Sequence, residues 1–219
     1  MGWKQWLERL GAASRVVDEN RWVMLDVETS GLDPHVDRLL AIAAIGLKID
    51  WSQQSIRIDV ADSFEVDLRQ ELTSSKDNIL LHGIGAQRQQ QGMVPEQALG
   101  CLADYVGQSP ILAFHANFDQ AMIDRACRKH LGSALPNPWV DLADLCAVTY
   151  DTVDARSLDQ WLDYFNLSCA VRHQAAADTL AECELLLCIW PRMVQQCQSW
   201  RQVQRLAAQR SWLVYGRGR

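Results

Sequence analysis

A chain of 219 residues is long enough for a single domain with a substantial core. Its composition, 48% hydrophobic and 22% charged residues, excludes an extensively disordered protein. No apolar segment approaches the roughly 20 residues that a transmembrane helix needs, and charged residues interrupt the N-terminal segment, which excludes a secretory signal. We therefore predict a cytoplasmic protein with no membrane partner.

The net charge of −6 is distributed unevenly along the chain. A basic C-terminal tail on an acidic body is compatible with contact to a polyanion, and also with an ordinary solvated helix face. The seven cysteines are scattered without a Cys-x-x-Cys pair, so we expect reduced, mostly buried side chains rather than a zinc site. Residues 185–219 contain no Asp or Glu but six arginines: Arg192, Arg201, Arg205, Arg210, Arg217 and Arg219.

Hydrophobic spacing predicts helices and strands in the order of an α/β domain. Trp3, Trp6 and Leu10 lie at helical spacing, which predicts an amphipathic helix over residues 3–15 that packs on the domain or on a partner. Apolar runs and alternation predict strands over residues 22–28, 39–49, 55–60 and 110–114, the first three antiparallel.

The remaining segments are predicted to be helical, apart from the polar and irregular stretch over residues 72–92. Pro95 stands where a first helical turn tolerates proline, and Ser157 is a candidate helix cap. An apolar stripe continues beyond Pro191. The predicted helices cover residues 95–106, 118–131, 139–150, 157–166 and 175–190.

Two acids stand in the first predicted strand. Asp26 and Glu28 are two residues apart, so in a strand they point to the same face. Carboxylates on one face of an otherwise apolar strand repel each other and are costly to desolvate, unless a hard cation lies between them. The alternative is a strand end at which water hydrates both acids. A metal site at this strand therefore requires further carboxylates from other segments.

Two later acids and a histidine are candidates to complete such a site. Asp119 stands near a helix start just after the strand over residues 110–114, where it could act as a ligand or cap the helix. Asp178 lies in an apolar helix and needs a partner, either a cation or the nearby Arg172. His173 cannot share the helix face of Asp178, so we predict that it projects from the adjoining loop or first turn.

These residues, taken together, resemble the motifs of the DEDDh 3′–5′ exonucleases. That superfamily includes the proofreading epsilon subunit of bacterial DNA polymerase III and RNA-trimming enzymes of the ribonuclease T and oligoribonuclease type. The resemblance covers about residues 22–190, and the segments His82-Gly83-Ile84 and Ser157-Leu158-Asp159 support it. Its three ordered motifs are Asp26-Val-Glu28-Thr29-Ser30-Gly31, Phe118-Asp119 and His173-x4-Asp178.

The resemblance implies an α/β, ribonuclease H-like fold with a mixed five-stranded sheet flanked by helices. On this basis we expect an exonuclease domain over residues 21–191. An N-terminal amphipathic helical extension would occupy residues 1–20, and a basic helical tail residues 192–219. The terminal helices could also bind a protein partner or form a homodimer.

The resemblance further implies two divalent cations, Mg²⁺ or Mn²⁺. Asp26, Glu28 and Asp178 would hold one ion, while Asp26 and Asp119, partly through water, would hold the other. His173 would then take a proton from the attacking water, a task that suits an imidazole near neutral pH. Thr29, Gly31 and Leu32 would approach the terminal nucleotide of the substrate.

The implied reaction is removal of 5′-mononucleotides from the 3′ end of single-stranded DNA, with a role in DNA repair. Trimming of RNA is the alternative within the same chemistry, and a non-catalytic docking module is the alternative outside it. One motif departs from the family pattern, because Phe114 and His115 stand where many members have His and Asn. His115 could bind a substrate phosphate or be a buried structural histidine.

Overall fold

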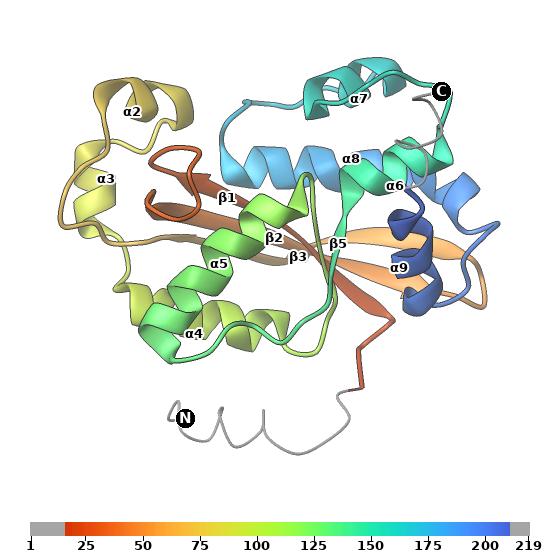
Figure 1. Ribbon diagram of the computed structural model, residues 1–219, viewed down its shortest axis with the longest axis horizontal. Coiled ribbons are helices and arrows are strands. Elements are labelled where there is room, and N and C mark those ends of the chain that lie inside the picture. Colours follow the sequence, from red (N-terminus) through yellow and green to blue (C-terminus); the bar gives the residue numbers. More distant parts are fainter. Residues whose placement is uncertain (1–15, 211–219) are drawn as a thin grey trace.

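The computed structural model describes residues 16–210. The helix predicted over residues 3–15 therefore lies outside the described residues. Residues 16–20 lead without helical structure into a five-stranded mixed sheet flanked by helices, as expected (Figure 1). The helices are α2 (Lys76–His82), α3 (Ala86–Gln91), α4 (Pro95–Val106), α5 (Ala116–Leu131), α6 (Leu142–Thr149), α7 (Leu158–Phe165), α8 (Ala175–Met193) and α9 (Trp200–Ala208).

The central strand of the sheet is the one that carries the paired acids. The order is β3-β2-β1-β4-β5, with β1 antiparallel to β2 and parallel to β4. Since β3 is antiparallel to β2 and β5 is parallel to β4, the predicted antiparallel start is confirmed. The strands are β1 (Arg21–Thr29), β2 (Leu39–Asp50), β3 (Ser55–Asp67), β4 (Ile111–Ala113) and β5 (Trp139–Asp141).

The strand predicted over residues 55–60 continues to Asp67. Its second half escaped prediction because a register shift interrupts the alternation of polar and apolar residues. Pairing jumps between Ile45 and Gly46 of β2, so that residues 60–62 of β3 bulge out of the ladder. Asp62 turns toward Gly46, where an added Cβ would lie 2.1 Å from its Oδ2, and its carboxylate binds Arg21. Because of this bulge, the alternation of side chains does not continue from the first half of β3 into the second.

Two further predictions of secondary structure were wrong. Residues 72–92 are not irregular but form α2 and α3, and the segment predicted as one helix over 139–150 begins with β5. Helix α2 has little apolar periodicity to detect, but both of its ends are capped. The Ser75 side chain accepts a hydrogen bond from the Asn78 N–H, and Gly83 ends the helix at φ 72°. Strand β5 has three residues, too few for alternation to be read.

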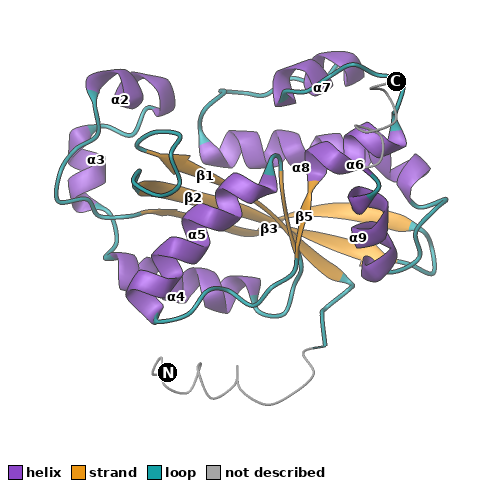
Figure 2. Cartoon of the chain, viewed as in Figure 1, coloured by secondary structure: helices purple, strands orange, loops and turns teal. Residues whose placement is uncertain are grey.

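Side chains of β1 alternate between two cores on opposite faces of the sheet. Trp22 and Met24 join a cluster with residues of α6, α7, α8 and α9, whereas Val23 and Leu25 join a second cluster with α4 and α5 (Figure 2). By the same alternation, the even-numbered acids that follow Met24 face α8. The apolar part of β1 thus fixes the face on which its acids are presented.

The segment after Pro191 packs against the first of these cores. Pro191 lies within α8, which ends at Met193 rather than at residue 190. Helix α9 buries Trp200, whose ring lies 4.9 Å from that of Trp22, together with Val203 and Leu206. The division of the chain at residues 20 and 191 stays a prediction, and α9 shares the core of the preceding residues.

All seven cysteines are free, and four of them are buried: Cys127, Cys146, Cys183 and Cys197. Between residues 16 and 210, none of the helices has the length and apolar character needed to cross a bilayer.

Candidate metal centre

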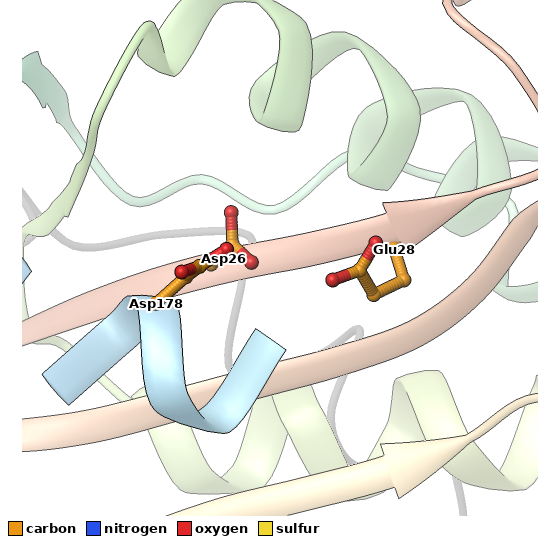
Figure 3. Close-up of side chains that lie close together, drawn as sticks. All are labelled: Asp26, Glu28 and Asp178. Atoms are coloured by element: carbon orange, nitrogen blue, oxygen red, sulfur yellow. The ribbon is translucent and has the colours of Figure 1, made fainter. Parts of the chain in front are cut away.

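Three carboxylates converge where β1 ends beneath the start of α8. Asp26 and Glu28 project from the same face of β1 toward Asp178 in the first turn of α8 (Figure 3). One carboxylate oxygen from each of the three lies within 4.8 Å of the others. Asp178 is buried and both strand acids are half-buried, so the alternative of a freely hydrated strand end does not describe them.

Asp119 is buried in the first turn of α5 and is not its cap. The helix begins at Ala116, and the residue in the cap position is His115, whose side chain makes no capping hydrogen bond. Burial raises the pKa of Asp119 well above its usual value, and the charge of Asp26 raises it further. Asp119 thus interacts electrostatically with Asp26, but it is not among the three acids whose oxygens lie within 4.8 Å of one another. The interpretation of Asp119 as a helix cap is wrong.

Asp178 is held by three residues that precede α8, Cys169, Arg172 and His173, and the Cys169 thiol donates to its Oδ1 at 3.3 Å. The Arg172 guanidinium binds its Oδ1 and also reaches Asp159, with Arg172 Nε 2.5 Å from Asp159 Oδ1. The backbone N–H of His173 donates to Asp178 Oδ2 at 2.9 Å. The ion pair with Arg172, proposed from the sequence as an alternative to metal binding, is thus present at the edge of the acid cluster.

The charges of this cluster oppose one another. Burial, followed by the charge of Asp178, raises the pKa of Asp26 to about 8, while Arg172 acts in the opposite direction. Burial, followed by the charges of Asp26 and Asp178, raises the pKa of Glu28 to about 9. One guanidinium is too little positive charge for these carboxylates. Oxygen ligands at this spacing suit hard divalent cations such as Mg²⁺ and Mn²⁺.

These shifts predict how the stability of the metal-free protein depends on pH. The protonated carboxyls of Asp26 and Glu28 stabilise the fold fully below their unfolded pKa values of 3.8 and 4.5, and this contribution is lost as pH rises through about 8 and about 9. We expect the melting temperature in EDTA to fall between about pH 5 and pH 9 and Mg²⁺ to restore it most at high pH. A melting temperature in EDTA that rises over this range would contradict the prediction.

A fifth acid, Glu182, was not identified from the sequence and lies next to the cluster on α8. Glu182 is only 2% exposed and stands one helical turn after Asp178 on α8. Burial raises its pKa well above the usual value, and the charges of Asp26, Asp119 and Asp178 raise it further, whereas the backbone N–H of Phe114 lowers it. Its spacing of four residues from Asp178 in an apolar helix was the signal that could have revealed it.

His173 lies in the segment just before α8, as predicted, with an exposed side chain and a left-handed backbone at φ 61°. Its backbone N–H contact with Asp178 places the residue beside the acid cluster. Among the described residues, its imidazole has no hydrogen-bond or ion-pair partner and is free to meet a ligand from solvent.

The residues predicted to approach a nucleotide lie at the end of β1 and in the loop that follows it. The hydroxyl of Thr29 donates to the Gly31 carbonyl at 2.6 Å, and Leu32 is 88% exposed. An added Cβ at Gly31 would lie 2.4 Å from Asp37 Oδ2, so a larger residue there would displace the Asp37 side chain. His115 is exposed, which overturns its interpretation as a buried structural histidine.

Helix α2 contacts the end of β1 through Asn78. The Asn78 side-chain amide donates to the Thr29 carbonyl at 2.8 Å, and its oxygen is 2.8 Å from His82 Nε2. His82 is buried, and its Nδ1 accepts from the Ile84 N–H. The His82-Gly83-Ile84 segment is therefore a structural support for the end of β1.

Residues 23–186 match the RNase_T family, described as exonuclease. The chain belongs to this exonuclease family. Among curated proteins it is similar to the PolC-type DNA polymerase III of Bacillus subtilis, with 27% identity over 177 residues and 80% of this chain. The enzyme of the same type from Thermotoga maritima is 26% identical over 166 residues, or 76% of this chain. This chain spans only 12% of the length of each of these polymerases.

The fold of this RNase_T member is also that of a solved nuclease. Escherichia coli exonuclease I in complex with a dT13 oligonucleotide superposes with a TM-score of 0.65 and 17% identity, over 81% of this chain and 42% of that one. A zinc-bound complex of the same enzyme with single-stranded DNA gives 0.65 and 16%, over 80% and 41%. The expected family and the ribonuclease H-like fold are confirmed, and the family's chemistry is phosphodiester hydrolysis.

Proposed function

We propose that this protein is a metal-dependent 3′–5′ exonuclease that releases 5′-mononucleotides from single-stranded DNA. The observation that carries the proposal is the convergence of Asp26, Glu28 and Asp178 within 4.8 Å in a member of an exonuclease family. The similarity of the fold to a nuclease solved with single-stranded DNA favours DNA as the substrate.

In this proposal the acids hold a pair of divalent cations, Mg²⁺ or Mn²⁺. Asp26, Glu28 and Asp178 would bind one ion, and Asp26 with Asp119 the other, partly through water. When bound, the pair supplies activation of the attacking water and stabilisation of the leaving 3′ oxygen. The backbone N–H of His173 orients Asp178 without a cation, and burial restricts the side chain of Asp119.

His173 would accept the proton of the attacking water on its imidazole. Its exposure beside Asp178 supports this role, because a general base must reach the water and exchange its proton with solvent. The exposed side chain of Leu32 would contact the terminal base, while the bond from Thr29 to Gly31 holds the loop in place. His115, also exposed, is available to a substrate phosphate.

The decisive assay follows product release from oligonucleotides labelled at either end. Single-stranded DNA and RNA are incubated separately with Mg²⁺, Mn²⁺ or EDTA, with Asp26→Ala as the inactive control. We expect mononucleotides to leave the 3′ end of DNA, and only with a divalent cation. Faster release from RNA would establish the RNA-trimming alternative. Absence of release from both substrates would overturn the proposal in favour of a docking module, for which α9 offers the exposed Arg201 and Arg205.

A further inference from the structure

Glu182 is a buried acid for which the described protein provides no complete set of partners. The residue is only 2% exposed, and its Oε2 has no hydrogen-bond partner among the described residues. The neighbouring charges are those of Asp26, Asp119 and Asp178, the same acids that make up the candidate metal centre. A buried carboxyl of this kind is costly unless something binds it.

Ionised Glu182 lacks a partner for one of its two carboxylate oxygens among the described residues. The carboxylate would leave Oε2 as an unsatisfied acceptor among like charges. A protonated carboxyl would instead stand among the other acids of the cluster, and a divalent cation bound by those acids would displace its proton. For the ionised form, the surrounding negative charge favours a cation as the partner.

We propose that Glu182 is a fifth carboxylate ligand of the cation pair, although its oxygens lie outside the group in which those of Asp26, Glu28 and Asp178 are within 4.8 Å of one another. This inference rests on the proposed metal centre and extends it. Residues four apart on a helix lie on the same face, so α8 presents Asp178 and Glu182 to the sheet one above the other. The backbone N–H of Phe114 lies beside the Glu182 carboxyl, at the end of β4 from which the chain leads to Asp119.

Glu184 on the same helix is a matched control. It differs from Glu182 by two positions, which turns it to another face of α8, and it is half-buried. Its charge acts on Cys183 and Cys188 rather than on the acids of the cluster. Replacing Glu184 by Gln removes one negative charge from α8 without altering the candidate centre.

The test is calorimetric titration of Mn²⁺ alone into the full-length protein and into Glu182→Gln, Glu182→Met and Glu184→Gln. We expect Glu182→Gln and Glu182→Met to weaken one of the two Mn²⁺ sites by about tenfold or more, since even residues that only support ligands change metal affinity roughly 10- to 100-fold. The other Mn²⁺ site and the Glu184→Gln variant should bind as the wild type does. Melting curves in EDTA establish that each variant is folded.

Unchanged Mn²⁺ affinity and stoichiometry in a folded Glu182 variant would overturn the inference. If both variants fail to fold, a crystal of the wild-type protein soaked in Mn²⁺ decides instead: a Glu182 oxygen in the coordination sphere of a cation supports the inference, and one outside it refutes it. Nuclease activity of the wild type is measured separately. Wild-type protein that degrades DNA while Glu182→Gln binds Mn²⁺ normally would leave the proposed function intact and remove only Glu182.

Discussion

Replacement of Asp26 by asparagine is expected to abolish nucleotide release while leaving the protein folded. Asp26 is the acid shared by both proposed cation sites, so the variant loses a charge that each ion requires. Metal ions contribute several kcal/mol of transition-state stabilisation, and each 1.4 kcal/mol is a factor of about ten in rate. We therefore expect turnover to fall by on the order of 10³-fold or more, measured as mononucleotide release at saturating substrate.

The same variant should melt no lower than the wild type in EDTA at about pH 8. Asparagine removes a carboxyl whose ionisation is opposed by desolvation and by Asp178, so the metal-free fold loses a source of repulsion. Asp124→Asn is the control, because Asp124 lies on α5 and pairs with Arg128 rather than with the cluster. Full activity in purified Asp26→Asn would remove the acid cluster from the mechanism.

Removal of the His173 imidazole is expected to lower turnover by about 10²- to 10⁴-fold, the usual contribution of a general base. Binding of Mn²⁺ should stay within a few-fold of the wild type, because it is the backbone N–H of His173, not its ring, that contacts Asp178. Single-turnover rates measure the chemical step, and a Mn²⁺ titration measures the metal centre. Loss of both in parallel would make His173 a structural residue of the centre.

The choice of substitution matters at residue 173 because its backbone is left-handed. Alanine adopts this conformation poorly, whereas asparagine does so more readily. His173→Asn should therefore melt closer to the wild type than His173→Ala while losing the same turnover. Different turnovers that follow the two melting temperatures would indicate a loss of structure rather than of a proton acceptor. Unchanged turnover in His173→Asn would refute the role of general base.

The part of the site that lies on regular structure could be predicted from the sequence. Asp26 and Glu28 share a face because strand side chains alternate, and the apolar residues before them made the strand evident. Asp178 was recognisable because most of the residues around it in its helix are apolar. By contrast, the bulge in β3, the capped helix α2 and the three-residue β5 arise from local hydrogen bonds and pairing with distant segments, which hydrophobic periodicity does not report.

The burial and tertiary contacts of individual side chains also could not be predicted from the sequence. The spacing of Glu182 from Asp178 was visible in the sequence, but its burial became evident only when the fold showed that α8 lies on the acidic face of β1. The burial of His115 was undecided in the sequence, because its exposure depends on a left-handed turn at the start of α5. The Arg172 pair was foreseen as a competitor of the metal, whereas the structure shows it at the rim of the same cluster.

The position of Arg172 has a thermodynamic consequence. Its guanidinium is always charged and binds both Asp178 and Asp159, the second residue of α7. In the proposed function, a cation that took Asp178 Oδ1 would free one side of this guanidinium while Asp159 still held the other. The freed N–H groups would be available to a substrate phosphate, so binding of the metal and binding of the nucleic acid would strengthen each other by the same factor.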